Sequence, residues 1–292
     1  MTLAAPGDLD LAGDNLEASS AGETAERSRL ALSPSRAADF RQCPLKYRLR
    51  AIDRIPEAPS PAATRGNVVH AALEALYDLP AAQRSPDRAS ELVDPAWDRL
   101  VEERPGLDGA FDEPERTALL AGARSLVRGY FQLEDPSAFE PSACESRVEV
   151  ELDDGVLLRG FIDRIDIAPD GALRVVDYKT GRVPAVMREQ SALFQMKFYA
   201  LIILRTRGVL AKQLRLLYLA GAEILTYGPD ADELFRFERT LSAMWRAIRA
   251  AGATGDFRPN PSRLCSWCDY RAICPAFGGS VPAYPGWPDT EE

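Results

Sequence analysis

The stretch VLLRGFIDRIDI (156–167), followed after a Pro-Asp-Gly turn (169–171) by LRVVDYK (173–179), decides the fold of this chain. Both segments are rich in β-branched and other apolar residues, a composition typical of strands. Upstream, Val148, Val150 and Leu152 alternate with charged residues and lead into an Asp-Asp-Gly turn. Strand-like segments joined by such turns predict hairpins, so we expect a three-stranded meander.

Helical patterns flank this meander on both sides. Downstream, the pattern predicts helices at about 189–205 and 230–250, with strands at 213–220 and 222–227 between them. Upstream, we expect one short basic helix that starts near Ser33 and runs past Cys43, then a helix with apolar residues at helical spacing, namely Val69, Leu73, Leu76 and Tyr77. Residues of about 87–133 are polar and helical, with breaks at Pro105 and Pro114, and we interpret them as a helical insertion. This order predicts an α/β fold with a central mixed β-sheet flanked by helices.

The composition allows one large α/β domain or two small ones, since 292 residues of which 46% are hydrophobic can bury a sizeable core. The formal charge of −9 argues against a protein that coats nucleic acid through bulk electrostatics. However, the first 26 residues contain six acids and no Lys or Arg, which indicates a disordered acidic tail over 1–30. The remainder is only mildly acidic, so the net charge does not exclude a local site for DNA.

No apolar run approaches the roughly 18 residues that a membrane span requires, and the N-terminus lacks the pattern of a secretory signal. We therefore expect a cytoplasmic protein without a membrane partner. In a reducing compartment, five cysteines indicate a metal or redox site more than disulfides.

Two carboxylates and an ammonium group lie on the meander. Asp163 interrupts an apolar strand, and Asp177 and Lys179 end the next strand. In a hairpin these ends can lie side by side, where two carboxylates repel each other unless a cation or proton lies between them. Mg²⁺ or Mn²⁺ fits there together with phosphate oxygens, and a lysine could orient or deprotonate the attacking water. The alternative is a set of strand-end salt bridges to Arg164, Arg174 or Lys179.

The motif GFID (160–163) followed by DYKTG (177–181) resembles the PD-(D/E)xK nuclease superfamily, specifically its RecB-like exonuclease branch. The resemblance covers most of the chain. It implies a restriction-endonuclease-like core, a single nuclease domain over 31–278, and Mg²⁺- or Mn²⁺-dependent hydrolysis of DNA. The proline of the superfamily name is replaced by Ile162, but RecB-like sequences commonly have an apolar residue there.

The resemblance also implies the roles of individual residues. A histidine on an upstream helix is expected to bind metal, and His70 is the chain's single histidine. A glutamate is expected on the first strand, where Glu145 fits best and Glu149 is the alternative. A Gln-x-x-x-Tyr pair on the following helix is matched by Gln195 and Tyr199, which share one helix face. The implied catalytic set is Lys179, Asp163, Asp177, Glu145, Gln195 and Tyr199, and the implied metal ligands are His70, Asp163, Asp177 and the Tyr178 carbonyl.

The cysteines form a C-x2-C-x5-C run of Cys265, Cys268 and Cys274, with Cys43 as a candidate fourth ligand. Thiolate sites suit zinc or an iron–sulfur cluster, and the spacing does not separate them. The chain is similar to iron–sulfur PD-(D/E)xK nucleases of the AddB and CRISPR-associated RecB-like types, with one cysteine ahead of the core and three behind it. This implies a [4Fe–4S] cluster on a C-terminal segment at about 258–278, with zinc as the alternative and a flexible tail over 279–292. Cys144 is expected to be a small core residue.

Together these features predict a DNA exonuclease that acts on single strands or DNA ends in repair or recombination. The chain has no G-x-x-x-x-G-K-[ST] motif, so any unwinding would come from a separate helicase. Two alternatives remain open. One is a non-catalytic nucleic-acid-binding subunit of a helicase–nuclease complex, and the other is an iron–sulfur redox or sensor protein.

Overall fold

A five-stranded mixed sheet forms the centre of the computed structural model, which describes residues 29–183 and 186–288. The strands are β1 (Ala143–Glu151), β2 (Leu157–Ile167), β3 (Leu173–Lys179), β4 (Gln213–Tyr218) and β5 (Glu223–Tyr227), side by side in chain order. Neighbours are antiparallel except β3 and β4, which are parallel. The predicted α/β fold with a central mixed sheet is therefore confirmed.

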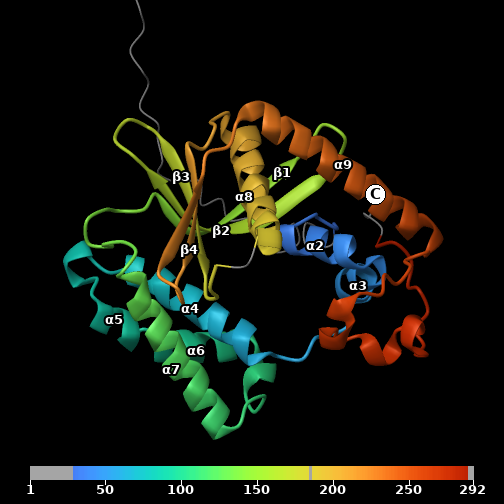
Figure 1. The fold of residues 1–292 in the computed structure, drawn as a ribbon, viewed down its shortest axis with the longest axis horizontal. Coiled ribbons are helices and arrows are strands. Elements are labelled where there is room, and N and C mark those ends of the chain that lie inside the picture. Colours follow the sequence, from blue (N-terminus) through green and yellow to red (C-terminus); the bar gives the residue numbers. More distant parts are fainter. Residues whose placement is uncertain (1–28, 184–185, 289–292) are drawn as a thin grey trace, which may run out of the picture. The chain divides into compact units, whose positions relative to one another are not determined.

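Helix α8 (Val186–Arg207) connects the two parallel strands and packs on one face of the sheet (Figure 1). A parallel pair requires such a crossover, because the chain must return to the same end of the sheet before the next strand starts. The helix begins a little before the predicted 189. Helix α9 (Ala231–Thr254) packs against α8 and ends at Gly255, whose φ of 73° is the left-handed conformation that closes many helices.

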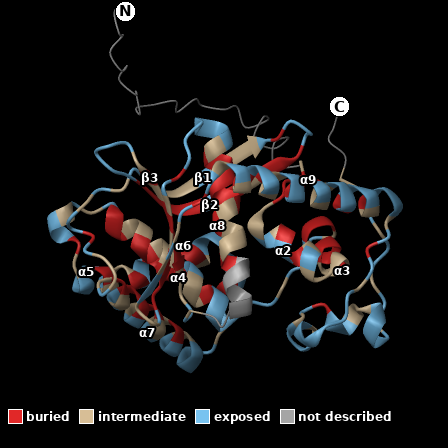
Figure 2. Cartoon of the chain, turned by 45° about the horizontal axis from the view of Figure 1, so that its top comes forward, coloured by how far each residue is buried: buried red, intermediate tan, exposed pale blue. Residues whose placement is uncertain are grey.

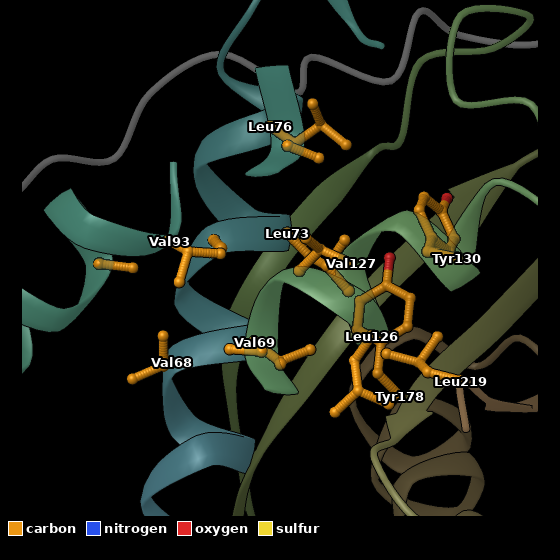
Figure 3. Packing of buried hydrophobic residues seen from close by; sticks show 14 of the residues in the cluster. Val68, Val69, Leu73, Leu76, Val93, Leu126, Val127, Tyr130, Tyr178 and Leu219 are labelled. Atoms are coloured by element: carbon orange, nitrogen blue, oxygen red, sulfur yellow. The ribbon is translucent and has the colours of Figure 1, made fainter. Parts of the chain in front are cut away.

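The opposite face of the sheet is covered by α4 (Pro61–Tyr77) and α7 (Glu113–Tyr130). Figure 3 shows their apolar side chains packed together with Tyr178 of β3 and with Leu219, just after β4. The segment interpreted as an insertion forms α5 (Pro86–Glu91), α6 (Val93–Glu103) and α7. Pro114 does not break this segment but lies in the first turn of α7, where a missing N–H costs no helical hydrogen bond. Two short 3₁₀ turns complete this part, at Ala81–Gln83 and Pro105–Leu107.

The prediction of one basic helix near the N-terminus was wrong in one respect. The chain forms α2 (Pro34–Gln42), breaks at Cys43, and continues as α3 (Pro44–Tyr47) and a π-helical turn at Arg48–Ile52. Cys43 is extended because the ring of the following proline disfavours helical torsions at the residue before it. The break directs the Cys43 side chain away from the regular helix face.

The C-terminal segment consists of 3₁₀ turns at Arg263–Trp267, Arg271–Ile273 and Pro275–Phe277. It lies beside α2 and α3, although more than 200 residues separate them in the chain, as the Asn260 side chain donates to the Gln42 carbonyl at 3.0 Å (Figure 1). The Tyr270 hydroxyl also donates to the Ile55 carbonyl at 3.0 Å.

Burial follows the layers, with buried residues on the inner sides of the helices and along the strands (Figure 2). None of the described helices combines the length and the apolar composition needed to cross a membrane. The predicted tail at 1–30 falls largely on residues 1–28, which are outside the described residues, as are residues 289–292 of the tail predicted at 279–292. Residues 279–288 are described and contact α9, where the Tyr284 hydroxyl donates to the Gly252 carbonyl at 2.9 Å and the Trp287 ring packs edge to face on Trp245.

Candidate active site

The two aspartates predicted to converge lie next to each other where β2 and β3 separate. The last paired positions of these strands are Arg164 and Val176, one residue before Asp163 and Asp177 meet. Beyond that point, Asp163 Oδ2 takes the place of a ladder acceptor and accepts the Tyr178 N–H at 2.6 Å. Val176 and Tyr178 pack toward α4 and α7, so strand alternation directs Asp177 to the opposite face, toward α8.

His70, on helix α4, lies next to the two aspartates. Its Nδ1 lies 3.4 Å from Asp163 Oδ1 and 3.6 Å from Glu145 Oε1, and its Nε2 lies 3.1 Å from the Tyr178 carbonyl oxygen. Glu145 on β1 has a φ of 42°, a left-handed torsion that is costly outside glycine and is often found at functional sites. The first-strand glutamate at the site is thus Glu145. Glu149 instead pairs with Arg159 and Arg147.

Gln195 of α8 links the remaining predicted residues. Its Nε2 donates to Asp177 Oδ1 at 2.7 Å and to the Tyr199 hydroxyl at 3.2 Å, while its Oε1 accepts from Lys179 Nζ at 2.8 Å. Lys179 Nζ also lies 2.6 Å from Asp177 Oδ2. The i, i+4 pair on α8 therefore holds the lysine against the aspartate. Lys179, Asp177, Gln195 and Tyr199 form one hydrogen-bonded chain.

Gly160 of the GFID motif allows Tyr199 to approach β2. A Cβ at this position would lie 2.7 Å from Tyr199 Cε1, well inside van der Waals contact. The glycine is therefore required by the close packing of α8 on β2, and not by its own backbone torsions. Through Tyr199 and Gln195, this packing sets the position of Lys179.

Several carboxylates lie close together in the site, and those of Asp163 and Asp177 are buried. Burial raises the pKa of Asp177 to about 6; Lys179 opposes this rise and the Asp163 carboxylate adds to it. Burial lowers the pKa of His70, but Asp163 and Glu145 outweigh burial and raise this pKa well above its usual value. Burial also opposes the charge on Lys179, and Asp177 more than offsets it, so the pKa of Lys179 is raised. The protein thus favours a cation among these carboxylates.

The donor atoms fit a hard divalent ion. One atom each from His70, Glu145 and Asp163 lies within 4.8 Å of the other two. Carboxylate oxygens with one imidazole suit Mg²⁺ or Mn²⁺. In the described part of the chain Asp177 is not a member of this group, and its two oxygens face Gln195 and Lys179. The metal-binding roles of Asp177 and the Tyr178 carbonyl remain predictions.

A model of a known family matches residues 31–275, which include every residue of this site. The chain belongs to the PD-(D/E)XK nuclease superfamily. PD-(D/E)XK nucleases use divalent metals, and the His70, Glu145 and Asp163 group could bind one. The superfamily also implies DNA as the class of substrate.

Two phage proteins and one solved structure are similar to most of this chain. The Gene 69 protein of Mycobacterium phage D29 is 28% identical, and that of Mycobacterium phage L5 is 26% identical; in each case 84% of this chain matches 96% of the phage protein. The crystal structure of a putative exonuclease from Eubacterium rectale matches with a TM-score of 0.54 and 14% identity. The match covers 88% of this chain and 94% of that one, and it shows a shared fold.

Arg164, next to Asp163 in the chain, was considered in the sequence only as a strand-end salt-bridge partner. Its side chain is fully buried, with Nη2 2.7 Å from Glu134 Oε2 and Nε 3.0 Å from Asp166 Oδ1. Its Nη1 lies 2.8 to 3.0 Å from three tyrosine hydroxyls, one of them Tyr178. An arginine between two acids in the GFIDRID stretch was the available signal, but its partner Glu134 comes from the loop after α7.

The four cysteines of the predicted cluster come together where the C-terminal segment lies beside α2 and α3. Cys43, Cys268 and Cys274 pack against one small cluster of Leu45, Leu49 and Tyr270. The Asn260 N–H donates to Cys43 Sγ at 3.3 Å, and the Ser262 N–H donates to Cys265 Sγ at 3.2 Å. Cys144 packs instead in the core beneath α4 and α7, where burial raises the pKa of its thiol to about 12.

Proposed function

We propose that this protein is a Mg²⁺- or Mn²⁺-dependent DNA exonuclease of the RecB-like type, acting on single strands or DNA ends. The observation that carries the proposal is the contact chain from Tyr199 through Gln195 to Lys179 and Asp177, next to the His70, Glu145 and Asp163 group. A simple salt bridge between Lys179 and Asp177 would not require a third side chain to hold the lysine. A catalytic site does require one, because the ammonium group must keep a fixed orientation toward the reacting atoms.

The residues divide the work as follows. His70, Glu145 and Asp163 would hold the metal, with Asp177 and the Tyr178 carbonyl as the further ligands that the family resemblance implies. A bound divalent ion activates water and neutralises charge on the phosphate. Lys179 lies at the edge of this group, where its ammonium can orient the attacking water or stabilise charge that develops on the phosphate. Gln195 fixes the lysine, and Tyr199 fixes Gln195.

The test is degradation of end-labelled single- and double-stranded DNA, with free and blocked ends, in Mg²⁺ and in Mn²⁺. We expect metal-dependent loss of the label from free ends, and about 100-fold or more loss of rate in Asp177→Ala and Lys179→Ala with folding intact. Lys212→Ala, an exposed lysine at the far end of β4, is the matched control and should retain the rate. A wild-type protein that degrades neither DNA nor RNA with either metal would contradict the proposal.

We also propose that Cys43, Cys265, Cys268 and Cys274 bind a [4Fe–4S] cluster that ties the two ends of the domain together. Backbone N–H groups already point at two of these sulfurs, as they commonly do around iron–sulfur centres. The family resemblance, with one cysteine ahead of the core and three behind it, supports a cluster, and zinc is the alternative. Unpaired thiolates fit a reducing cytoplasm.

The biological setting proposed for this activity is DNA repair or recombination. Because the sequence has no G-x-x-x-x-G-K-[ST] motif, a separate helicase would supply unwound strands. Co-purification of a helicase, or stimulation of the nuclease by one, would support this partner.

A further inference from the structure

A cavity of about 550 Å³ opens beside the candidate site, between α2, β2 and α8. Gln195 and Tyr199 of the catalytic chain line it together with Gly160. A second cavity of about 620 Å³ contains His70 and Glu145 and reaches α6. Phe161 lines both cavities, so its ring stands at the boundary between them. A ligand that crosses the site would pass over this side chain.

The first cavity is rich in positive charge. Three arginines line it, namely Arg36 and Arg41 from α2 and Arg159 from β2. Arg159 pairs with Glu149, and Arg36 Nη1 donates to the Ala31 carbonyl at 2.8 Å. Among the described residues, no carboxylate lies within ion-pair distance of Arg36 or Arg41. Burial lowers the pKa of Arg36, and the neighbouring Arg159 lowers it further. Such a group of guanidinium ions is stabilised by an anion, and phosphate matches their geometry.

Aromatic rings accompany these charges. Phe161 is 54% exposed, although most residues of β2 are buried. The Arg41 guanidinium lies 5.1 Å from the centre of the Phe194 ring, and Phe194 packs edge to face on Phe237. Phe161 is thus an exposed ring near arginines, the combination with which proteins bind single-stranded nucleic acids, because a base stacks on the ring while the cation contacts a phosphate.

We propose that this arginine-lined cavity binds unpaired nucleotides of the substrate strand, and that Phe161 stacks on the base next to the cleaved phosphate. The inference rests on the proposed nuclease function and adds the cavity and the side chain that bind the substrate strand. A base within a duplex is stacked on both sides and cannot cover the Phe161 ring, whereas an unpaired base can. The site therefore selects a single strand or a frayed end.

The test is the affinity for a fluorescein-labelled 15-nucleotide oligodeoxythymidine and for a blunt hairpin duplex, measured by anisotropy in Mg²⁺. All proteins carry Lys179→Ala, so that cleavage does not consume the probe. Phe161→Ala should weaken binding of the single strand about 5-fold or more, and Phe161→Trp should restore it. Arg41→Ala should reduce the slope of log K against log salt by about 0.7, the value of one phosphate contact on a single strand.

Two exposed residues away from both cavities serve as matched controls. Phe235→Ala on α9 and Arg128→Ala on α7 should leave affinity and salt slope unchanged. The proposal is overturned if Phe161→Ala binds the single strand as tightly as its parent, or if it weakens the blunt duplex equally. Because binding is measured without cleavage, Phe161-dependent binding by a protein whose wild type cuts nothing would support this cavity while contradicting the nuclease proposal.

Discussion

Replacing Arg164 with methionine tests how much the buried ion network contributes to stability. The arginine is fully buried and pairs with Glu134 and Asp166, themselves almost completely buried. Methionine has a similar length, so the change removes the charge while leaving little empty space. The two acids would then lose their shared central partner.

The expected cost follows from what remains around the acids. Breaking a buried ion pair costs about 3–5 kcal/mol, because the remaining charge has no compensation. Here Arg174 stays 2.7 Å from Asp166, and Arg215 stays 3.2 Å from Glu134. We therefore expect the lower end, about 3 kcal/mol. For a domain of this size that corresponds to a fall in Tm of roughly 6–12 °C.

The assay is thermal unfolding followed by circular dichroism, with Arg124→Met as the matched control. Arg124 pairs with Asp94 at 2.6 Å, but both side chains are exposed. Exposed pairs contribute less than about 1 kcal/mol, so the control should lose less than about 4 °C. If Arg164→Met lowers the Tm by no more than the control does, the buried ion network does not stabilise the fold.

Three further predictions concern the site and the cysteines. Gly160→Ala should lower the nuclease rate about 10- to 100-fold with little change in Tm, because its Cβ would displace Tyr199, whereas Gly106→Ala, which meets no atom within 4 Å, should not. Cys43→Ala should abolish visible absorbance of anaerobically purified protein, and Cys144→Ala should retain it; a colourless wild type with one zinc would contradict the cluster. In metal-free protein, the pKa of Asp177 is about 6 in the folded state and 3.8 in the unfolded state. Between pH 3.8 and about 6, the Asp177 carboxyl is therefore protonated mainly in the folded state. The free energy of unfolding should then fall by up to about 3 kcal/mol as pH rises through that window, and Asp177→Asn should lack this component.

Local pattern in the sequence was enough to predict the meander, the helices around it and the motif positions. Alternation and turn residues act over a few neighbours, so the strands and the approach of Asp163 to Asp177 could be inferred without any long-range contact. The break at Cys43 was also encoded locally, by the proline that follows it, although the prediction missed it.

Tertiary structure alone decided how these parts meet. The choice of Glu145 over Glu149 depends on the register of β1. The residues on either side of Glu145 pair with Arg164 and Ile162, which places Glu145 opposite Asp163, whereas Glu149 pairs with Arg159. The bridge from Gln195 to Lys179 depends on how α8 packs across β2, and the Arg164 partner Glu134 comes from the loop after α7. The sequence by itself thus determined the elements and the residue types of the site. The contacts among those residues were determined by packing between segments far apart in the chain, which no local pattern records.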